Sequence, residues 1–419
     1  MISRNACYWI WITLSIGYNN PKVKRISEMY SDVSAFYYGG ISEWRLCGIF
    51  SQKDIERFSS TGLDDAKKIV DRCIECNYSI LCIDDELFPK CLYNIECPPA
   101  LIYVNGVMPD IDNTFSIGIV GTRRATKYGI ENSYRFAYAL SKYGTIIVSG
   151  GALGVDGASH RGALATDGIT ICVRGCGLNC SYLRENSDIR STIPKRGAVI
   201  TEYPPDETPR NYYFPARNRI IAALSDGLLV MEAGKKSGSL ITANLAAEQG
   251  KTIFALLGNN SPQNEGSNAL IKEGLAIPVT DFMDILCEFD SLYATTDDEF
   301  DIDNISLADT GNFPVKGIRK QASARIYVNK QNDRQPAKTA VPYVSEKSET
   351  VVQKPVHKEN LNLPKTAQDV YEYIGNEPVH IDKISADLKI PVFKVLTALT
   401  MLEMKDLVSA LQGRNYILK

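Results

Sequence analysis

Residues 226–258 read DGLLVMEAGKKSGSLITANLAAEQGKTIFALLG, and this stretch decides the fold class. It contains two short apolar runs, DGLLVMEA and TIFALLG, separated by the loop GKKSGS and a helical pattern. Strands that are apolar at nearly every position are buried on both faces, which is typical of parallel sheets connected by helices. The stretch therefore predicts one strand–helix–strand unit of an α/β domain.

The same alternation extends toward the N-terminus as far as residue 115. The apolar segments SIGIV, TIIVSGG, ITICVRG and GAVITEY alternate with helical segments and glycine-containing loops. Neighbouring parallel strands need crossover connections, and helical crossovers cover the faces of the sheet. We therefore predict a Rossmann-like, doubly wound parallel sheet.

Composition changes on both sides of this sheet. Residues 1–80 read as short helices and predict a small helical domain of the SAM or helix-hairpin-helix kind, followed by the Rossmann-like domain at 81–290. Residues 291–363 are polar, without apolar periodicity, and predict a disordered linker. Residues 364–419 contain three helical segments and then SALQGRNYILK, which turns at Gln412-Gly413. This order predicts a winged helix, the β-wing form of the helix-turn-helix.

The totals restrict the functional classes. The 419 residues carry a formal net charge of −3, so any contact with nucleic acid must come from local basic loops. No apolar run approaches the roughly 20 residues of a membrane span, and the N-terminal apolar stretch lacks a clear signal-peptide cleavage site.

Several of the 11 cysteines lie inside apolar runs, as reduced cytoplasmic cysteines do. Neither Cys73-x-x-Cys76 nor Cys172, Cys176 and Cys180 has the spacing of a complete zinc site, and no metal or cofactor is expected.

The loops that follow the predicted strands carry the candidate chemistry. Ligands of open parallel sheets bind beyond the carboxyl ends of the strands. Here nearly every such loop combines small residues with Arg or Lys, and helix N-termini behind them favour anions. The first strand–helix turn, GIVGTRRATKYG, has neither the GxGxxG dinucleotide fingerprint nor a Walker lysine. The pattern therefore predicts a groove for phosphates other than those of NAD or a hydrolysed NTP.

Several of these segments resemble the DNA-processing protein A family (DprA, or Smf). The resemblance covers about Phe88 to Leu286, and it lies in GIVGTRRATKYG, SGGALGVDGASHRGAL, GCGLN, FPARNRIIAALSDGLLVMEAGKKSGSLITANLAAEQGK and NEGSNALIKEG. It implies a non-enzymatic protein that binds single-stranded DNA, forms a homodimer and helps to load the RecA recombinase. It also implies a role beside single-strand-binding protein in DNA uptake, natural transformation and recombination.

The resemblance also implies which residues contact DNA. The residues that match the family's motifs are Gly121, Thr122, Arg123, Ser149, Gly150, Gly151, Arg184, Phe214, Arg217, Asn218, Arg219, Lys236, Ser237, Gly238 and Ser239. Two segments depart from the family pattern. Leu183 stands where the motif Y-P-x-x-N has proline, and GLN replaces the usual G-[IL]-D before it. The shape of that loop is therefore open at this stage.

Plainer interpretations compete with these roles. Arg217 or Arg219 could pair with a carboxylate, although at least one is expected to face the groove; Tyr212 and Tyr213 are expected to be packing residues. Asp156 is expected to bond nearby backbone rather than form a catalytic pair with His160, and Glu232 to form an ion pair. The third helix of the winged-helix segment carries only Lys394 and Lys405, so it fits protein contact as well as major-groove reading.

Two other functions remain open. A nucleotide-cleaving phosphoribohydrolase would have a Pro-Gly-Gly-x-Gly-Thr loop followed by a catalytic glutamate, whereas Gly234–Thr242 contains Ser-Gly-Ser and the next glutamate is Glu248. A regulator acting through the winged helix would need a basic recognition helix, which the sequence does not offer.

Overall fold

The computed structural model describes residues 1–289 and, in the C-terminal part, 365–375, 378–390, 395, 398, 399, 402, 407–411 and 415–418. The chain divides into two compact units, Met1–Gln335 and Pro336–Lys419. The predicted linker at 291–363 lies outside the described residues. None of the helices in the described part of the chain is long and apolar enough to span a membrane.

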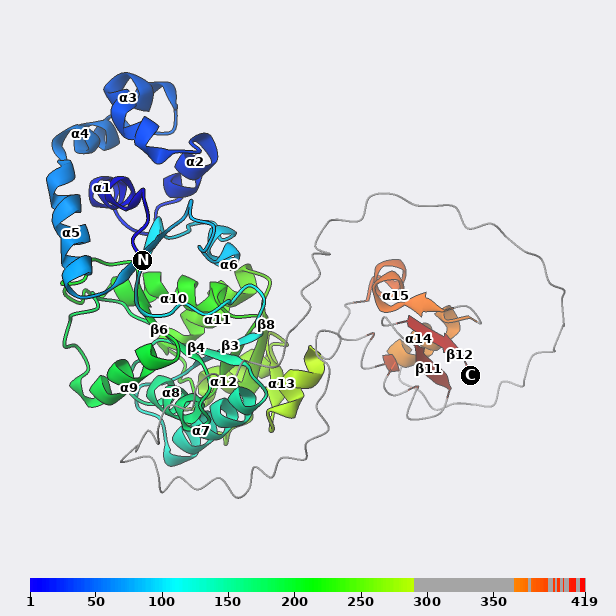
Figure 1. The fold of residues 1–419 in the computed structure, drawn as a ribbon. Coiled ribbons are helices and arrows are strands. Elements are labelled where there is room, and N and C mark those ends of the chain that lie inside the picture. Colours follow the sequence, from blue (N-terminus) through cyan, green and yellow to red (C-terminus); the bar gives the residue numbers. More distant parts are fainter. Residues whose placement is uncertain are drawn as a thin grey trace. The chain divides into compact units, whose positions relative to one another are not determined.

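The N-terminal part of the first unit is helical, as the sequence predicts (Figure 1). Its helices are α1 (Ala6–Ile16), α2 (Lys22–Met29), α3 (Val33–Leu46), α4 (Gln52–Ser60) and α5 (Leu63–Glu75). Helix α1 is apolar on all sides and is buried among the others, as such helices must be. The ring of Trp11 packs on Phe36, Trp44 and Phe58. Helix α4 starts with a capping box formed by Ser51 and Asp54.

A nine-stranded sheet and its helices form the rest of the described part of this unit. Its strands are β1 (Ser79–Cys82), β2 (Leu101–Gly106), β3 (Ser116–Val120), β4 (Ile146–Ser149), β5 (Thr170–Val173), β6 (Ala198–Thr201), β7 (Gly227–Val230), β8 (Thr252–Leu256) and β9 (Ile277–Val279). The strand order is β1-β2-β6-β5-β4-β3-β7-β8-β9. Strands β3 to β9 pair in parallel, whereas β1 and β2 add an antiparallel edge. The sheet is therefore mixed, and the predicted boundary at residue 80 falls inside β1.

Helices cover both faces of the sheet (Figure 1). The connecting helices are α6 (Lys90–Tyr93), α7 (Lys127–Lys142), α8 (Val155–Ala165), η1 (Arg184–Asn186), α9 (Ser187–Thr192), η2 (Ile193–Lys195), α10 (Tyr213–Ala223), α11 (Gly238–Glu248), α12 (Glu265–Lys272) and α13 (Met283–Glu288). Alternate residues of β7 and the residue after it show the two faces. Leu228 and Val230 pack in the core that holds α10 and α11, whereas Leu229 and Met231 pack in the core that holds α7, α8 and α13. This arrangement confirms the doubly wound α/β prediction.

The strand order reverses at β3, whose neighbours are β4 and β7. The carboxyl ends of β3, β4, β5 and β7 share one edge of the sheet because these strands are parallel. Ligand crevices of open α/β sheets form at such a switch point.

The C-terminal unit contains α14 (Lys365–Tyr373), β10 (Val379–His380), α15 (Ile381–Leu388), β11 (Val408–Leu411) and β12 (Asn415–Leu418). Its sheet has three strands in the order β10-β12-β11, so β10 joins the two strands of the predicted wing. Most of the predicted third helix, with Lys394 and Lys405, and the turn at Gln412-Gly413 lie outside the described residues.

Candidate nucleic-acid interface

The structure brings most of the predicted site residues to the carboxyl edge of the parallel strands. Gly121, Thr122 and Arg123 follow β3, and Gly150 and Gly151 follow β4. The lysine loop leads from β7 to the start of α11. Residues 214–219 belong to the first half of α10.

A pocket of about 360 Å³, open solvent included, lies at this edge. Four arginines and two aromatic rings take part in its wall. The lining residues are Arg123, Gly150, Gly151, Ala152, Cys172, Arg174, Gly175, Cys176, Tyr182, Leu183, Arg190, Phe214 and Arg217. Five of these lining residues were predicted as DNA contacts from the sequence. No Asp, Glu or His is among the described residues that line the pocket.

Arg217 forms the inner wall of the pocket and is 5 % exposed. Its Nη1 donates to the carbonyl oxygens of Gly150, at 2.8 Å, and of Val173. Burial lowers the pKa of the guanidinium, and the nearby Asp156 carboxylate partly offsets this effect. A Cβ on Gly150 would lie 2.7 Å from both terminal nitrogens of Arg217, so glycine is needed for this approach.

Arg123 and two rings form the mouth of the pocket. The Arg123 side chain is exposed, its Cζ lies 5.3 Å from the centre of the Phe214 ring, and its Nη1 donates to the Tyr182 hydroxyl at 3.3 Å. The Tyr182 and Phe214 ring centres are 5.4 Å apart. A Cβ on Gly175 would lie 2.9 Å from the Phe214 ring. The mouth therefore offers a guanidinium beside an aromatic surface, which is a combination that suits phosphate and unpaired bases.

Two pocket arginines were missed by the sequence reasoning. Arg174, which is 5 % exposed, follows β5 and donates to the carbonyl oxygens of Gly177, Leu178 and Cys180. Arg190 is half-buried on α9 and donates to the carbonyl oxygen of Leu183 at 2.6 Å. Arg174 could have been predicted as a site residue, because it is a charged residue directly after the apolar run ITICV. Arg190 lies in a polar helix and carried no such signal.

The pocket's guanidinium groups have carbonyl or hydroxyl partners. Among the described residues, none of the four forms an ion pair with a carboxylate; the ion-paired arginines lie elsewhere. Buried or clustered cations are normally compensated by an anion. The pocket therefore has the charge of an anion site.

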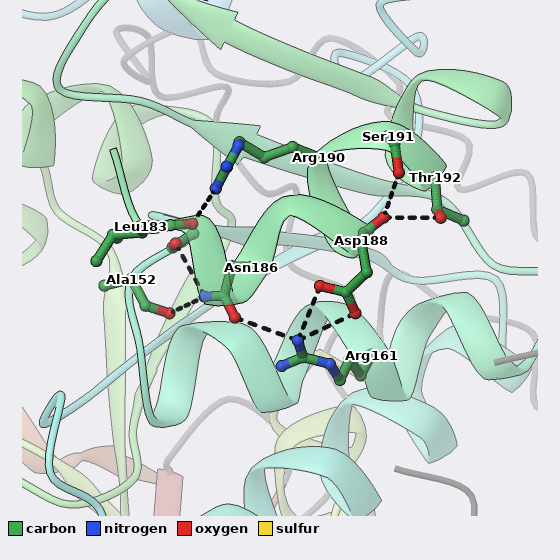
Figure 2. A network of polar contacts seen from close by, with 9 residues as sticks. Ala152, Arg161, Leu183, Asn186, Asp188, Arg190, Ser191 and Thr192 are labelled. Carbon is green, nitrogen blue, oxygen red and sulfur yellow. Dashed lines mark hydrogen bonds and ion pairs between the residues drawn. The ribbon is translucent and has the colours of Figure 1, made fainter. Parts of the chain in front are cut away.

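A polar network fixes the loop after β4 against η1 and α9 (Figure 2). The Asn186 side-chain amide donates to the carbonyl oxygens of Ala152, at 2.8 Å, and Gly151, at 3.2 Å. Its oxygen accepts from Arg161, whose Nη2 also donates to both carboxylate oxygens of Asp188 at 3.1 Å. Asn186 therefore holds two walls of the pocket together.

The two departures from the family pattern have physical counterparts in this loop. Leu183 has φ +60°, which a proline ring cannot adopt. Asn179, the last residue of GLN, accepts from the Tyr78 hydroxyl and donates to Asp206, both at 2.7 Å. An aspartate at this position could not donate to Asp206. The present loop therefore depends on a residue other than proline at position 183 and on the side-chain amide at position 179.

The lysine loop lies on the same edge but does not line the pocket. Ser237 caps α11 by accepting from the backbone N–H of Ser239, and Lys236 is exposed. The Asn218 side chain approaches the carbonyl oxygen of Gly238 at 3.5 Å, which places α10 beside this loop. Arg184 is exposed on η1 outside the pocket.

Two predicted contacts are turned inward. Arg219 is 5 % exposed, and its guanidinium pairs with both oxygens of Glu202 at 2.7 Å. Arg219 therefore pairs with a carboxylate, as the alternative interpretation expected. Of the two arginines, Arg217 is the one that lines the pocket. Ser149 is fully buried and its hydroxyl donates to the carbonyl oxygen of Ile119, so only its backbone lies near the edge.

The remaining polar expectations had mixed outcomes. Asp156 accepts from the backbone N–H of Ala152 as expected, and His160 contacts Thr170 instead. The expected ion pair of Glu232 is wrong. Its carboxylate accepts from the backbone N–H and hydroxyl of Thr126, the N-cap of α7, because helix N-termini attract anions.

Tyr213 is a packing residue, as expected. It is 5 % exposed and stacks on Tyr203 with ring centres 3.8 Å apart. Tyr212, by contrast, is 61 % exposed, so its predicted packing role is wrong. The two tyrosines differ because only Tyr213 lies inside the first turn of α10, against the sheet.

Comparison with known proteins agrees with this architecture. Residues 79–290 match the model of the family described as DNA recombination-mediator protein A, and residues 357–414 match the DprA winged helix domain. The second match supports the winged-helix prediction for the C-terminal unit.

Individual relatives match over different lengths. The chain is 39 % identical to Protein Smf of Escherichia coli over 212 residues, which are 50 % of this chain and 56 % of that protein. It is 32 % identical to Protein Smf of Synechocystis over 346 residues, 81 % of this chain and 80 % of that protein. The X-ray structure of DNA processing protein A from Streptococcus pneumoniae has a TM-score of 0.58 at 30 % identity, covering 66 % of this chain and 95 % of that one. The chain belongs to the DNA recombination-mediator protein A family.

Proposed function

We propose that this protein binds single-stranded DNA along the carboxyl edge of its sheet and helps to load RecA recombinase onto it. It would act in the cytoplasm as a homodimer, beside single-strand-binding protein, in DNA uptake and recombination. The observation that carries the DNA-binding part is the pocket, where four guanidiniums, none of which forms an ion pair within the described structure, lie beside two aromatic rings. The family's description as a recombination mediator supports the RecA part.

The mouth of the pocket favours a single strand over a duplex. The Phe214 and Tyr182 rings lie next to Arg123. A nucleotide whose phosphate binds the Arg123 guanidinium would therefore have its base near one of these rings. Only an unpaired base can leave its stack to lie on a side chain, and each such contact contributes about 1–3 kcal/mol for any base. Arg123, Lys236 and the loop backbone would follow the phosphates.

Fluorescence anisotropy with a labelled oligo-dT tests the binding. Arg123→Ala should weaken binding and reduce the salt slope by about 0.7 for each phosphate that the variant no longer neutralises. Arg124→Ala is the matched control, because Arg124 is also exposed in the same loop but does not line the pocket. Equal effects of the two changes would count against the pocket as the binding site. A preference for duplex would count against the single-strand proposal.

RecA loading needs a separate measurement. On a strand covered by single-strand-binding protein, the wild type should shorten the lag before RecA begins to hydrolyse ATP, and Arg123→Ala should not. An unchanged lag with a wild-type protein that still binds the oligo-dT would disprove loading while leaving DNA binding in place.

The nucleotide-cleaving alternative finds little support in the pocket. In the part of the chain that the structure describes, no Asp, Glu or His lines the pocket. Burial raises the pKa of the Cys172 and Cys176 thiols to about 11, so neither is a thiolate at neutral pH. Glu248, the first glutamate after the lysine loop, is exposed at the C-terminal end of α11. Hydrolysis of this type needs a general base close to the bound nucleotide.

A further inference from the structure

We propose that the four-arginine pocket binds a phosphomonoester, namely the phosphorylated end of a DNA strand, in preference to a phosphodiester within the strand. This inference rests on the proposed function, because it states which part of a bound strand enters the pocket. Its chemical basis is the depth, the charge and the unused hydrogen-bond donors of the pocket.

The arginines lie at different depths. Arg123 is exposed at the mouth, whereas Arg174 and Arg217 are each 5 % exposed in the wall behind it. An internal phosphodiester continues as a chain in two directions, so a strand that runs past the mouth reaches Arg123 first. A terminal phosphate is attached on one side only, and it can therefore point inward toward Arg217.

The charge of the pocket exceeds that of a single phosphodiester. Four guanidiniums line it, and Asp156 beside Arg217 supplies one buried carboxylate near them. A phosphodiester carries one negative charge, whereas a phosphomonoester carries between about 1.5 and 2 at pH 7 and offers three terminal oxygens. The monoester therefore compensates the cluster better.

A buried donor in the pocket is unused. The Nε of Arg217 is inaccessible to solvent and has no hydrogen-bond partner among the described residues, although the residue lines the pocket. Both hydrogen bonds of this guanidinium come from Nη1, so Nη2 has no acceptor among the described residues and remains for a ligand oxygen. A Cβ at position 150 would lie 2.7 Å from Nη1 and Nη2, so Gly150 leaves room for this end of the guanidinium.

The mouth then accommodates the first base of the strand. With the end phosphate inside the pocket, the base of the same nucleotide lies within reach of the Phe214 and Tyr182 rings at the rim. Stacking of that base adds affinity without sequence preference. The pocket and its mouth would together hold a phosphate end and its nucleotide.

The test compares strand ends on the wild-type full chain. Two oligo-dT strands of equal length carry a 3′ label and either a 5′-phosphate or a 5′-hydroxyl, and a mirrored pair tests the 3′ end. We expect the phosphorylated strand of at least one pair to bind roughly tenfold more tightly, which is the order of one charge-assisted hydrogen bond. Arg190→Gln should remove the preference, whereas Arg124→Gln should keep it.

The outcomes separate this inference from the proposed function. Equal affinity for phosphate and hydroxyl ends, with normal binding of both strands, would overturn the inference and leave single-strand binding intact. Failure of every strand to bind would overturn both. A direct titration with dTMP distinguishes free nucleotides from strand ends: tight dTMP binding without discrimination between the two ends would also overturn the inference. The wild-type comparison does not depend on how well the Arg190 variant folds.

Discussion

Replacing Arg219 by methionine should destabilise the protein and leave its DNA contacts in place. The guanidinium is buried between α10 and the sheet, where it pairs with both carboxylate oxygens of Glu202 and donates to the carbonyl oxygen of Cys97. The side chains of the pair are 6 % and 3 % exposed. Methionine keeps much of the length of the side chain but removes the charge, so Glu202 is left buried without its partner.

The expected loss is large. Removing one member of a buried ion pair costs about 3–5 kcal/mol, chiefly because the remaining charge stays desolvated. A loss of 1 kcal/mol lowers the melting temperature of a domain of this size by about 2–4 °C. The thermal transition of the full chain should therefore fall by roughly 6–20 °C.

Circular dichroism on heating measures this shift, and anisotropy with oligo-dT at low temperature measures DNA binding while the variant is still folded. The double variant Arg219→Met/Glu202→Leu is the control, because replacing both members of a buried pair by apolar residues is often neutral or stabilising. It should recover most of the lost stability.

The opposite pattern would refute the assignment of Arg219 to the core. If Arg219→Met melted like the wild type and its affinity for oligo-dT fell, the guanidinium would have to reach the DNA backbone. The ion pair with Glu202 would then not describe the folded protein in solution.

Three further changes have defined outcomes. Gly150→Ala places a methyl group against Arg217 and should weaken oligo-dT binding together with a loss of about 1–3 kcal/mol in urea unfolding; unchanged binding would contradict the described approach of the two residues. Thr126→Ala removes the N-cap of α7 and a bond to Glu232 and should cost about 0.5–2 kcal/mol by the same measurement, without changing DNA affinity. Burial lowers the pKa of His160 from 6.5 to about 3, so the unfolded chain takes up a proton that the folded protein does not, and the free energy of unfolding should fall as the pH drops below about 6.5. The loss attributable to His160 reaches about 2 kcal/mol at pH 5, and His160→Gln should show a correspondingly weaker pH dependence between pH 7.5 and 5.

The position of the site was predictable because it depends on strand direction. A run of apolar strands linked by helices forces the strands to be parallel, and parallel strands end at one edge. The basic loops after β3 and β7 therefore lie at the same edge. This holds whatever the direction of their side chains. The antiparallel edge of β1 and β2 was not predictable in this way, since short strands outside the alternation carry no sign of their partner.

The division of labour between Arg217 and Arg219 follows from helix geometry. Positions i and i+2 differ by roughly 200° around a helix, so the two side chains point in nearly opposite directions. This geometry explains why only Arg217 of the two lines the pocket, although both arginines were predicted as DNA contacts. The sequence could not tell which one would do so, because that depends on how α10 is rotated against the sheet.

Other site residues depend on contacts between distant segments. Arg190 reaches the pocket only because Asn186 and the carbonyl oxygen of Leu183 hold α9 against it (Figure 2). Glu232 caps α7 across 106 positions of sequence. No local pattern encodes such pairings, which are settled when the whole sheet assembles.

The left-handed backbone of Leu183 has an evolutionary consequence. A leucine in this conformation costs of order 1–2 kcal/mol, and a change to the family's proline would need φ near −65° instead of +60°. That single substitution would turn the peptide that supplies the acceptor for Arg190, so the loop would have to rebuild around it. The present loop conformation therefore resists replacement by the family's proline, because a protein with that change alone would lose a wall of the pocket. Glycine at this position would relieve the strain, and the loop could then accept further substitutions.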